Sequence, residues 1–169
     1  LHKPKNKSIK YYPIVGPPGT FQTDLTFYEQ YKGSNKNYSL ILCAIEVNSR
    51  RAYTRPLKNK SIGNIIDAFK SIIEEAKEFI PVSVVGTDQG SEFLSQFVTM
   101  LEKEGIDHYY SNIGDKHSNG MVERFNRTIR GLIEKYMTSR NTHKWFDVLP
   151  ELTSNYNNSI HSSTGLEPN

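Results

Sequence analysis

The sequence predicts an α/β protein whose core is a five-stranded mixed β-sheet with helices on both faces. Two observations lead to this fold class. Three strand-like segments follow one another within residues 21–57, separated only by turn residues, which is typical of an antiparallel meander. Beyond residue 61, helical and strand-like patterns alternate, as they do where helices cover the faces of a sheet. We therefore expect the strand after the first helix to lie parallel to the first strand.

The first three strands are expected in segments that are rich in β-branched and aromatic residues, because such side chains pack well on a pleated surface. The turn YKGSNKN separates the first two segments, and the corner NSR separates the second from the third. The predicted strands are FQTDLTFYEQ (21–30), YSLILCAIEV (38–47) and RRAYTRPL (50–57).

The second half of the chain changes to a helical period. From Ile62 the apolar residues recur at the three- and four-residue spacing of an amphipathic helix, with Ser61 as its N-cap. The β-branched run at 81–87 predicts a buried strand. The other predicted elements are a helix at 91–105, a strand at 106–110, a long helix that follows the polar loop 111–120 and ends near Ser139, and a last helix from about Thr142 to Asn157.

The chain is expected to form one domain, at residues 21–169, preceded by an arm or linker at residues 1–20. The first ten residues hold four lysines and no acid, and prolines punctuate the arm. Residues 115–144 hold seven Lys or Arg against three acids. Two basic stretches on a body of net charge +3 fit a polyanionic partner such as DNA. A start at Leu1 rather than Met is expected of part of a longer protein.

Two classes of protein are excluded by composition. The chain has one cysteine, Cys43, inside an apolar run, so neither a disulfide framework nor a cysteine-based zinc site can form within it. The longest apolar run, residues 39–47, is far shorter than a bilayer-spanning helix. We expect no membrane partner.

Three acids stand in positions where acids are unusual. Asp24 lies inside the first predicted strand, Asp88 follows the fourth, and Glu123 is in the first turn of the long helix. Each has an ordinary explanation when taken singly: an exposed strand residue, a helix cap and a complement to the helix dipole. If the first and fourth strands are neighbours, however, two of the acids share one edge of the sheet, and the helix can bring the third beside them.

Carboxylates that cluster in this way need a cation. At about 4 Å and an effective dielectric near 20, each pair repels by roughly 4 kcal/mol. A divalent ion removes that penalty, and Mg²⁺ prefers oxygen ligands while keeping waters for substrate phosphates. Two ions about 4 Å apart stabilise the attacking and leaving oxygens of an in-line phosphoryl displacement. The sequence therefore predicts hydrolysis or transfer at a phosphodiester.

Three segments that carry these acids resemble a known family. TDLTFY, TDQGSEF and SNGMVERFNRTIR are similar to the signatures of the retroviral-type integrase catalytic core, in the D,D,E integrase and transposase superfamily. The closing segment YNNSIHSSTGLEPN also resembles the end of that core. The box VERFNRT is closest to integrases of Maverick/Polinton elements and virophages. Asp88 and Glu123 have 34 residues between them, one fewer than is commonest in retroviral integrases.

The resemblance implies a fold, a reaction and a site. The implied fold is ribonuclease H-like, and residues 21–169 would be an integrase catalytic core domain. The implied reaction is metal-dependent 3′-end processing and strand transfer of mobile-element or viral DNA into target DNA. Roles carried over by position are catalysis and binding of two Mg²⁺ or Mn²⁺ ions by Asp24, Asp88 and Glu123, and DNA contact by Asn119, Arg127, Arg130 and Lys116.

Partners and rival functions follow from the same resemblance. DNA ends, target DNA and further copies of the chain, as a homodimer or higher multimer, are the expected partners. The expected location is the host nucleus or the virion. Two alternatives stay open: a ribonuclease H-like nuclease, and a catalytically silent DNA-binding or assembly module.

Overall fold

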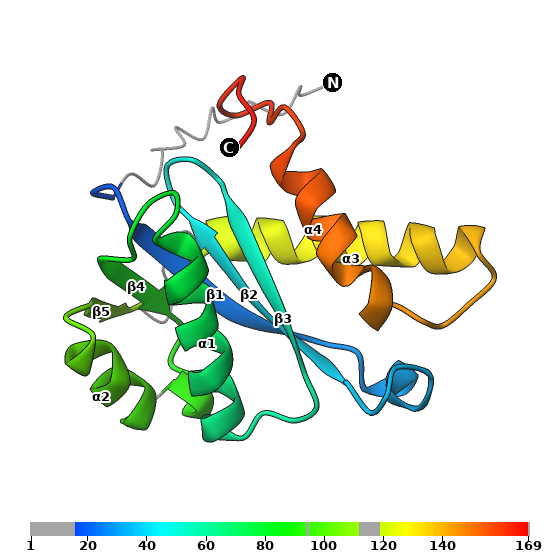
Figure 1. Cartoon of the computed structure of the whole chain (residues 1–169), viewed down its shortest axis with the longest axis horizontal. Helices are drawn as coiled ribbons and strands as arrows, with labels where there is room; N and C mark the ends of the chain where they lie inside the picture. Colours follow the sequence, from blue (N-terminus) through cyan, green and yellow to red (C-terminus); the bar gives the residue numbers. More distant parts are fainter. Residues whose placement is uncertain (1–15, 94, 112–118, 169) are drawn as a thin grey trace, which may run out of the picture.

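The fold is a five-stranded mixed sheet with one long and one short α-helix on each face (Figure 1). The computed structural model describes residues 16–93, 95–111 and 119–168. The strands lie in the order β3-β2-β1-β4-β5. Their bounds are β1 Thr20–Phe27, β2 Leu40–Glu46, β3 Ala52–Leu57, β4 Val84–Thr87 and β5 Asp107–Tyr110, and the α-helices are α1 Ile62–Ala76, α2 Gln96–Lys103, α3 Gly120–Ser139 and α4 Leu149–Asn157. None of the helices in these ranges has the length and apolar character needed to cross a membrane.

The strand pairing confirms the predicted topology. β1 pairs antiparallel with β2, and β2 pairs antiparallel with β3. β4 pairs parallel with β1, with Phe21 opposite Val85 and Gln22 opposite Gly86, as expected for a strand that returns through a helix. β1 is therefore the central strand, with a hairpin partner on one side and a parallel partner on the other.

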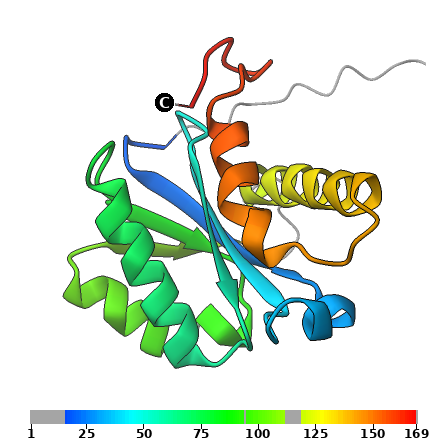
Figure 2. The ribbon, with the colours of Figure 1, turned by 45° about the vertical axis from the view of Figure 1, so that its right-hand side comes forward.

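Each face of the sheet has its own hydrophobic core. Leu42 and Ala44 of β2 pack with α1 and α2, while Ile41, Cys43 and Ile45 pack with α3 and α4. The alternation follows the period of two residues along a strand. Because both faces are covered, every residue of β2 is buried. Figure 2 shows the two helical layers on opposite sides of the sheet.

Several predicted boundaries were wrong, including the start of the fourth strand, which is Val84 rather than residue 81. β1 ends at Phe27, and a 3₁₀-helix, η1, occupies Glu29–Ser34. The predicted helix at 91–105 is instead a short 3₁₀ turn followed by α2, because Ser95 has φ of +36°, outside the helical region. The last helix begins at Leu149 rather than Thr142.

The late start of α4 has a tertiary cause. The side-chain oxygen of Asn35, which is almost fully buried, accepts hydrogen bonds from the backbone N–H groups of Trp145 (2.7 Å) and Phe146 (3.0 Å). Its amide nitrogen donates to the carbonyls of Tyr31 and His143. These bonds replace the intrahelical ones that a helix would make there. Residues 142–145 therefore form a link that ties η1 to the end of α3.

Candidate active site

Asp24 lies on the face of β1 that α3 covers. It is opposite Cys43, which packs in the core on that face, and directly opposed residues project to the same side of a sheet. Its Oδ1 accepts a hydrogen bond from the N–H of Leu25 at 2.8 Å, and its Oδ2 accepts one from the side-chain amide of Asn126 at 2.9 Å. The carboxylate is half-buried and points toward the helix.

Asp88 follows β4, the strand that pairs parallel with β1. The paired register ends with Gln22 opposite Gly86, two residues before Asp24 and Asp88 in the sequence. Asp88 lies just beyond the end of β4 and is exposed, and its Oδ1 accepts a hydrogen bond from the N–H of Gly90 at 3.0 Å. The carboxyl ends of parallel strands open into a crevice where ligands commonly bind.

The start of α3 is attached to β1 by two side chains that the sequence analysis did not single out. Gln22 is fully buried, and its Oε1 accepts hydrogen bonds from the N–H groups of Met121 (3.0 Å) and Val122 (3.2 Å). These two N–H groups have no partner inside the helix. One turn later Asn126 binds Asp24. Nothing in the sequence marks this contact, because a polar amide in a strand has many ordinary roles.

Glu123 lies between these two attachment points. It is exposed, in the first turn of α3, where the helix dipole favours a negative charge. With Thr26, Asn126, Arg127 and Arg130 it lines a shallow depression of about 460 Å³. Glu123, Arg127 and Arg130 therefore share one face, as predicted, and this face borders β1.

The other predicted DNA contacts fall differently. Arg127 is exposed. Arg130 donates a hydrogen bond from Nη2 to the carbonyl of Phe27 at 3.2 Å and lies over the ring of Tyr28. Asn119 precedes α3 and is mostly buried, and its Oδ1 has no hydrogen-bond partner in the described part of the chain. Lys116 lies outside the described residues.

The three acids do not form a closed metal cluster. Across residues 16–93, 95–111 and 119–168, no three His, Cys, Asp or Glu side chains are close enough together to hold one ion. Asp24 and Asp88 instead accept hydrogen bonds from nearby N–H groups. Asp24 lies in the central strand, Asp88 follows the strand paired with it, and Glu123 lies in the helix that is attached to β1. The metal-binding roles of Asp24, Asp88 and Glu123 remain a prediction.

The electrostatics around Asp24 exclude the neighbouring cysteine as a nucleophile. Burial raises the pKa of the Cys43 thiol far above its usual value, and the charge of Asp24 raises it further, while Arg130 lowers it. The thiol is therefore neutral at physiological pH, whereas cysteine chemistry requires the thiolate.

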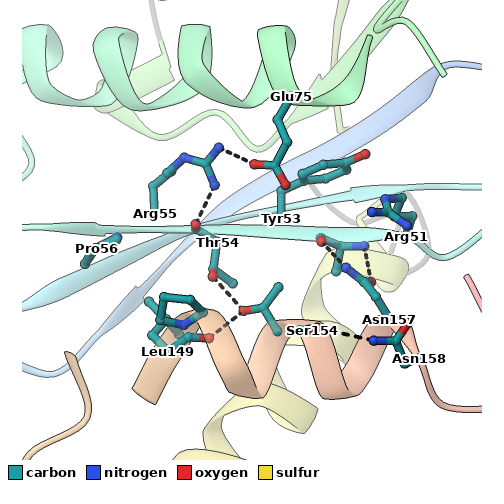
Figure 3. A pocket seen from close by; sticks show the side chains of 13 residues that line it. Arg51, Tyr53, Thr54, Arg55, Pro56, Glu75, Leu149, Ser154, Asn157 and Asn158 are labelled. Atoms are coloured by element: carbon teal, nitrogen blue, oxygen red, sulfur yellow. Dashed lines mark hydrogen bonds and ion pairs between the residues drawn. The ribbon is translucent and has the colours of Figure 1, made fainter. Parts of the chain in front are cut away.

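The closing segment has a structural role at the edge of the sheet. Asn157 is buried, and its side chain binds the backbone of Ala52 twice: Oδ1 accepts from the N–H at 2.9 Å, and Nδ2 donates to the carbonyl at 2.8 Å (Figure 3). A hydrogen bond between Thr54 and Thr153 lies alongside. These contacts occupy part of the outer edge of β3, which is otherwise open to pairing with another chain.

A depression of about 410 Å³ lies between β3, α1 and α4, in the region shown in Figure 3. Two of its charged groups, Arg55 and Glu75, form an ion pair with each other. Its lining includes a single acid, Glu75, and so offers no cluster of carboxylates.

Replacing Asn157 with alanine is expected to lower the free energy of unfolding by about 2–3 kcal/mol, because the variant leaves a buried N–H and a carbonyl of Ala52 without partners. Equilibrium unfolding in urea measures the change. Asn155→Ala, at an exposed position of the same helix, serves as the control and should change stability by less than about 0.5 kcal/mol. Equal effects of the two substitutions would contradict the role assigned to Asn157.

Comparison with known proteins gives one matching family model and several relatives. The model described as "Integrase core domain" matches residues 15–116, more than half of the chain. It includes Asp24 and Asp88, and Glu123 lies beyond its end. An uncharacterized transposon-derived protein of Caenorhabditis elegans is 27% identical over 139 residues, which is 82% of this chain and 48% of that protein. The chain thus spans about half the length of this relative.

Two solved structures share the fold. The HTLV-2 integrase catalytic core domain, in complex with magnesium and in a trimeric form, superposes with a TM-score of 0.71 at 22% identity, covering 90% of this chain and 94% of that one. A chain of the simian T-cell lymphotropic virus intasome, in complex with a PP2A regulatory subunit, gives a TM-score of 0.74 at 19% identity, covering 86% and 51%. The similarity covers most of this chain in both cases, and it confirms the ribonuclease H-like fold.

Proposed function

This chain belongs to the integrase core domain family, and from that premise we propose that it is the catalytic core of a DNA integrase that processes DNA 3′ ends and joins them to target DNA. The observation that carries the proposal is the parallel pairing of β1 with β4, whose last pair, Gln22 with Gly86, stands two residues before Asp24 and Asp88. The contacts of Gln22 and Asn126 hold the first turn of α3, with Glu123, against the same strand.

We propose that Asp24, Asp88 and Glu123 bind two Mg²⁺ or Mn²⁺ ions. The donor set fits: the groups are carboxylates, which Mg²⁺ prefers. Asn126 adds a buried Oδ1 that has no hydrogen-bond partner among the described residues. The HTLV-2 core of the same fold was solved in complex with magnesium. When bound, such ions would stabilise negative charge on the attacking and leaving oxygens of a phosphodiester.

The protein's own groups would position the DNA. Arg127 and Arg130 lie on the face of α3 that holds Glu123, where they can neutralise phosphates on either side of the reacting one. Asn119 and Lys116 are proposed as further contacts near the start of the helix. Asn126 would orient the Asp24 carboxylate through the hydrogen bond to Oδ2.

The proposed reaction has two displacements at phosphorus. Water attacks a phosphodiester near the end of the element and releases a free 3′-hydroxyl. That hydroxyl then attacks a phosphodiester of the target, forming a new P–O bond while the bond to the target's own 3′ oxygen breaks. Neither step uses a covalent protein intermediate, in agreement with the neutral, buried Cys43.

The test supplies pre-trimmed element ends together with a plasmid, with Mg²⁺ or Mn²⁺ present. We expect joined products, and their loss when EDTA removes the ion. Cleavage of the plasmid without joining would favour the ribonuclease H-like nuclease. Binding to DNA with neither cleavage nor joining would favour the silent module.

Three finer assignments belong to the same proposal. The box VERFNRT and the transposon-derived relative support an origin in a Maverick/Polinton element or virophage. A phylogeny that grouped the chain with vertebrate retroviral integrases would contradict this origin.

The trimeric form of the HTLV-2 core supports self-association as a dimer or higher multimer, and a monomeric mass by light scattering with DNA present would contradict it. Integration into host DNA would require the host nucleus, where imaging of the tagged protein should find it.

A further inference from the structure

A second basic site begins at the hairpin between β2 and β3. Arg50 has φ of +68°, a left-handed conformation that glycine adopts most readily. The hairpin is held by the buried Glu46, whose Oε2 accepts hydrogen bonds from the N–H groups of Asn48 (2.9 Å) and Ser49 (2.6 Å). A large charged residue thus occupies a position that favours glycine, in a turn that is fixed in place. Backbone strain of this kind is concentrated at functional sites.

The Arg50 guanidinium has an unsatisfied donor. Its Nη1 is buried and has no hydrogen-bond partner in the described part of the chain. Burial lowers the pKa of Arg50 and the nearby charge of Arg124 acts in the same direction, whereas Tyr156 and Glu46 raise it. Among the described residues neither arginine forms an ion pair with a carboxylate within 4.0 Å, and the carboxylate of Glu46 is occupied by the hairpin. Two adjacent cations and a buried, unpartnered donor are the arrangement that an anion would complete.

A hydroxyl group from α4 completes the cluster. The Tyr156 ring packs between Phe125 (centroids 4.7 Å apart) and His161 (4.4 Å). Burial raises the pKa of Tyr156 to about 12, and the charges of Arg50 and Arg124 act on the same hydroxyl in the opposite direction. The hydroxyl therefore keeps its proton at neutral pH and can donate it in a hydrogen bond. In both ribbon views the hairpin lies beside the C-terminal end of α4 (Figures 1 and 2).

We propose that Arg50, Arg124 and Tyr156 bind one phosphate of a DNA backbone, at a site separate from the three acids. Arg124 follows Glu123 directly in α3 and, together with Tyr156, lines a depression of about 400 Å³ on the side of the helix next to α4. DNA whose reacting phosphate lay at Glu123 could therefore place a nearby phosphate here. The identity of the ligand as DNA rests on the proposed function, whereas the anion site rests on the three side chains.

The test measures the affinity for a short DNA duplex by fluorescence anisotropy, in EDTA and over a series of salt concentrations. The variants are Arg50→Gly, which suits the left-handed backbone, Arg124→Gln, and Tyr156→Phe, which keeps the ring. Each arginine variant should bind DNA about fivefold more weakly or worse and reduce the slope of log K against log salt by about 1. The double variant should lose little more than either single one, because both act on one phosphate.

The control is Lys103→Gln, which removes one exposed positive charge in the last turn of α2, on the opposite face of the sheet. It should weaken binding less than about twofold, because screening limits distant charges. The proposal is overturned if Arg50→Gly, with an unchanged melting temperature, binds as tightly as Lys103→Gln. Since EDTA removes catalysis from the measurement, failure of DNA joining would reject the proposed function without affecting this result.

Discussion

Replacing Glu123 with glutamine is expected to reduce DNA joining by at least about 10³-fold while leaving the fold intact. The substitution preserves the size of the side chain but removes the charge that would hold a divalent ion, and charge stabilisation of that kind is among the largest contributions to phosphoryl transfer. The Glu123 side chain is exposed and forms no hydrogen bond among the described residues. Its loss should therefore cost the fold only the helix-dipole contribution, about 0.3–1 kcal/mol.

Joining of pre-trimmed ends is the activity to measure, and circular dichroism with thermal melting reports the fold. Glu134→Gln is the matched control, because Glu134 is an exposed acid on the same helix, outside the depression that Glu123 lines. It should join DNA at the unmodified rate. A Glu123→Gln protein that joined DNA as well as this control would remove the third acid from the proposed site.

Replacing Glu46 with glutamine is expected to lower the free energy of unfolding by about 2–4 kcal/mol, the largest stability effect we expect from a single isosteric change. Glu46 is fully buried, and its carboxylate accepts hydrogen bonds from the N–H groups of Gly19, Asn48 and Ser49 and from the Asn48 side chain. An amide has one acceptor oxygen, so its NH₂ group would face N–H donors. Hydrogen bonds to a charged group contribute roughly 1.5–3 kcal/mol, and leaving buried donors unpaired costs about as much.

Urea denaturation at equilibrium gives the change in stability, provided that the slope with denaturant is unchanged. Glu102→Gln, at an exposed position of α2, is the matched control and should stay within about 0.5 kcal/mol of the unmodified chain. If the two variants unfolded at the same urea concentration, the carboxylate of Glu46 would have no special role in holding the hairpin.

The residues that form the proposed site divide according to the kind of information that identifies them. Asp24, Asp88 and Glu123 are detectable in the sequence because Asp24 interrupts a strand-like segment, Asp88 directly follows a β-branched run, and Glu123 heads a basic helix. Gln22 and Asn126 are not detectable in this way, since a polar amide in a strand or a helix has many ordinary roles. Their function depends on a contact between residues about a hundred positions apart.

The sequence by itself determined the order of the strands and helices, the buried face of each, and the acids that a metal would need. It could do so because side chains return to the same face every two residues in a strand and every 3.6 residues in a helix. The spacing of apolar residues along the chain therefore predicts which face is buried. Only the tertiary structure decided the parallel pairing of β1 with β4, the late start of α4 at Leu149, and the contacts by which Gln22 and Asn126 hold α3 against β1. Those features depend on which distant backbone and side-chain groups satisfy one another, and that choice is made by packing the whole sheet at once.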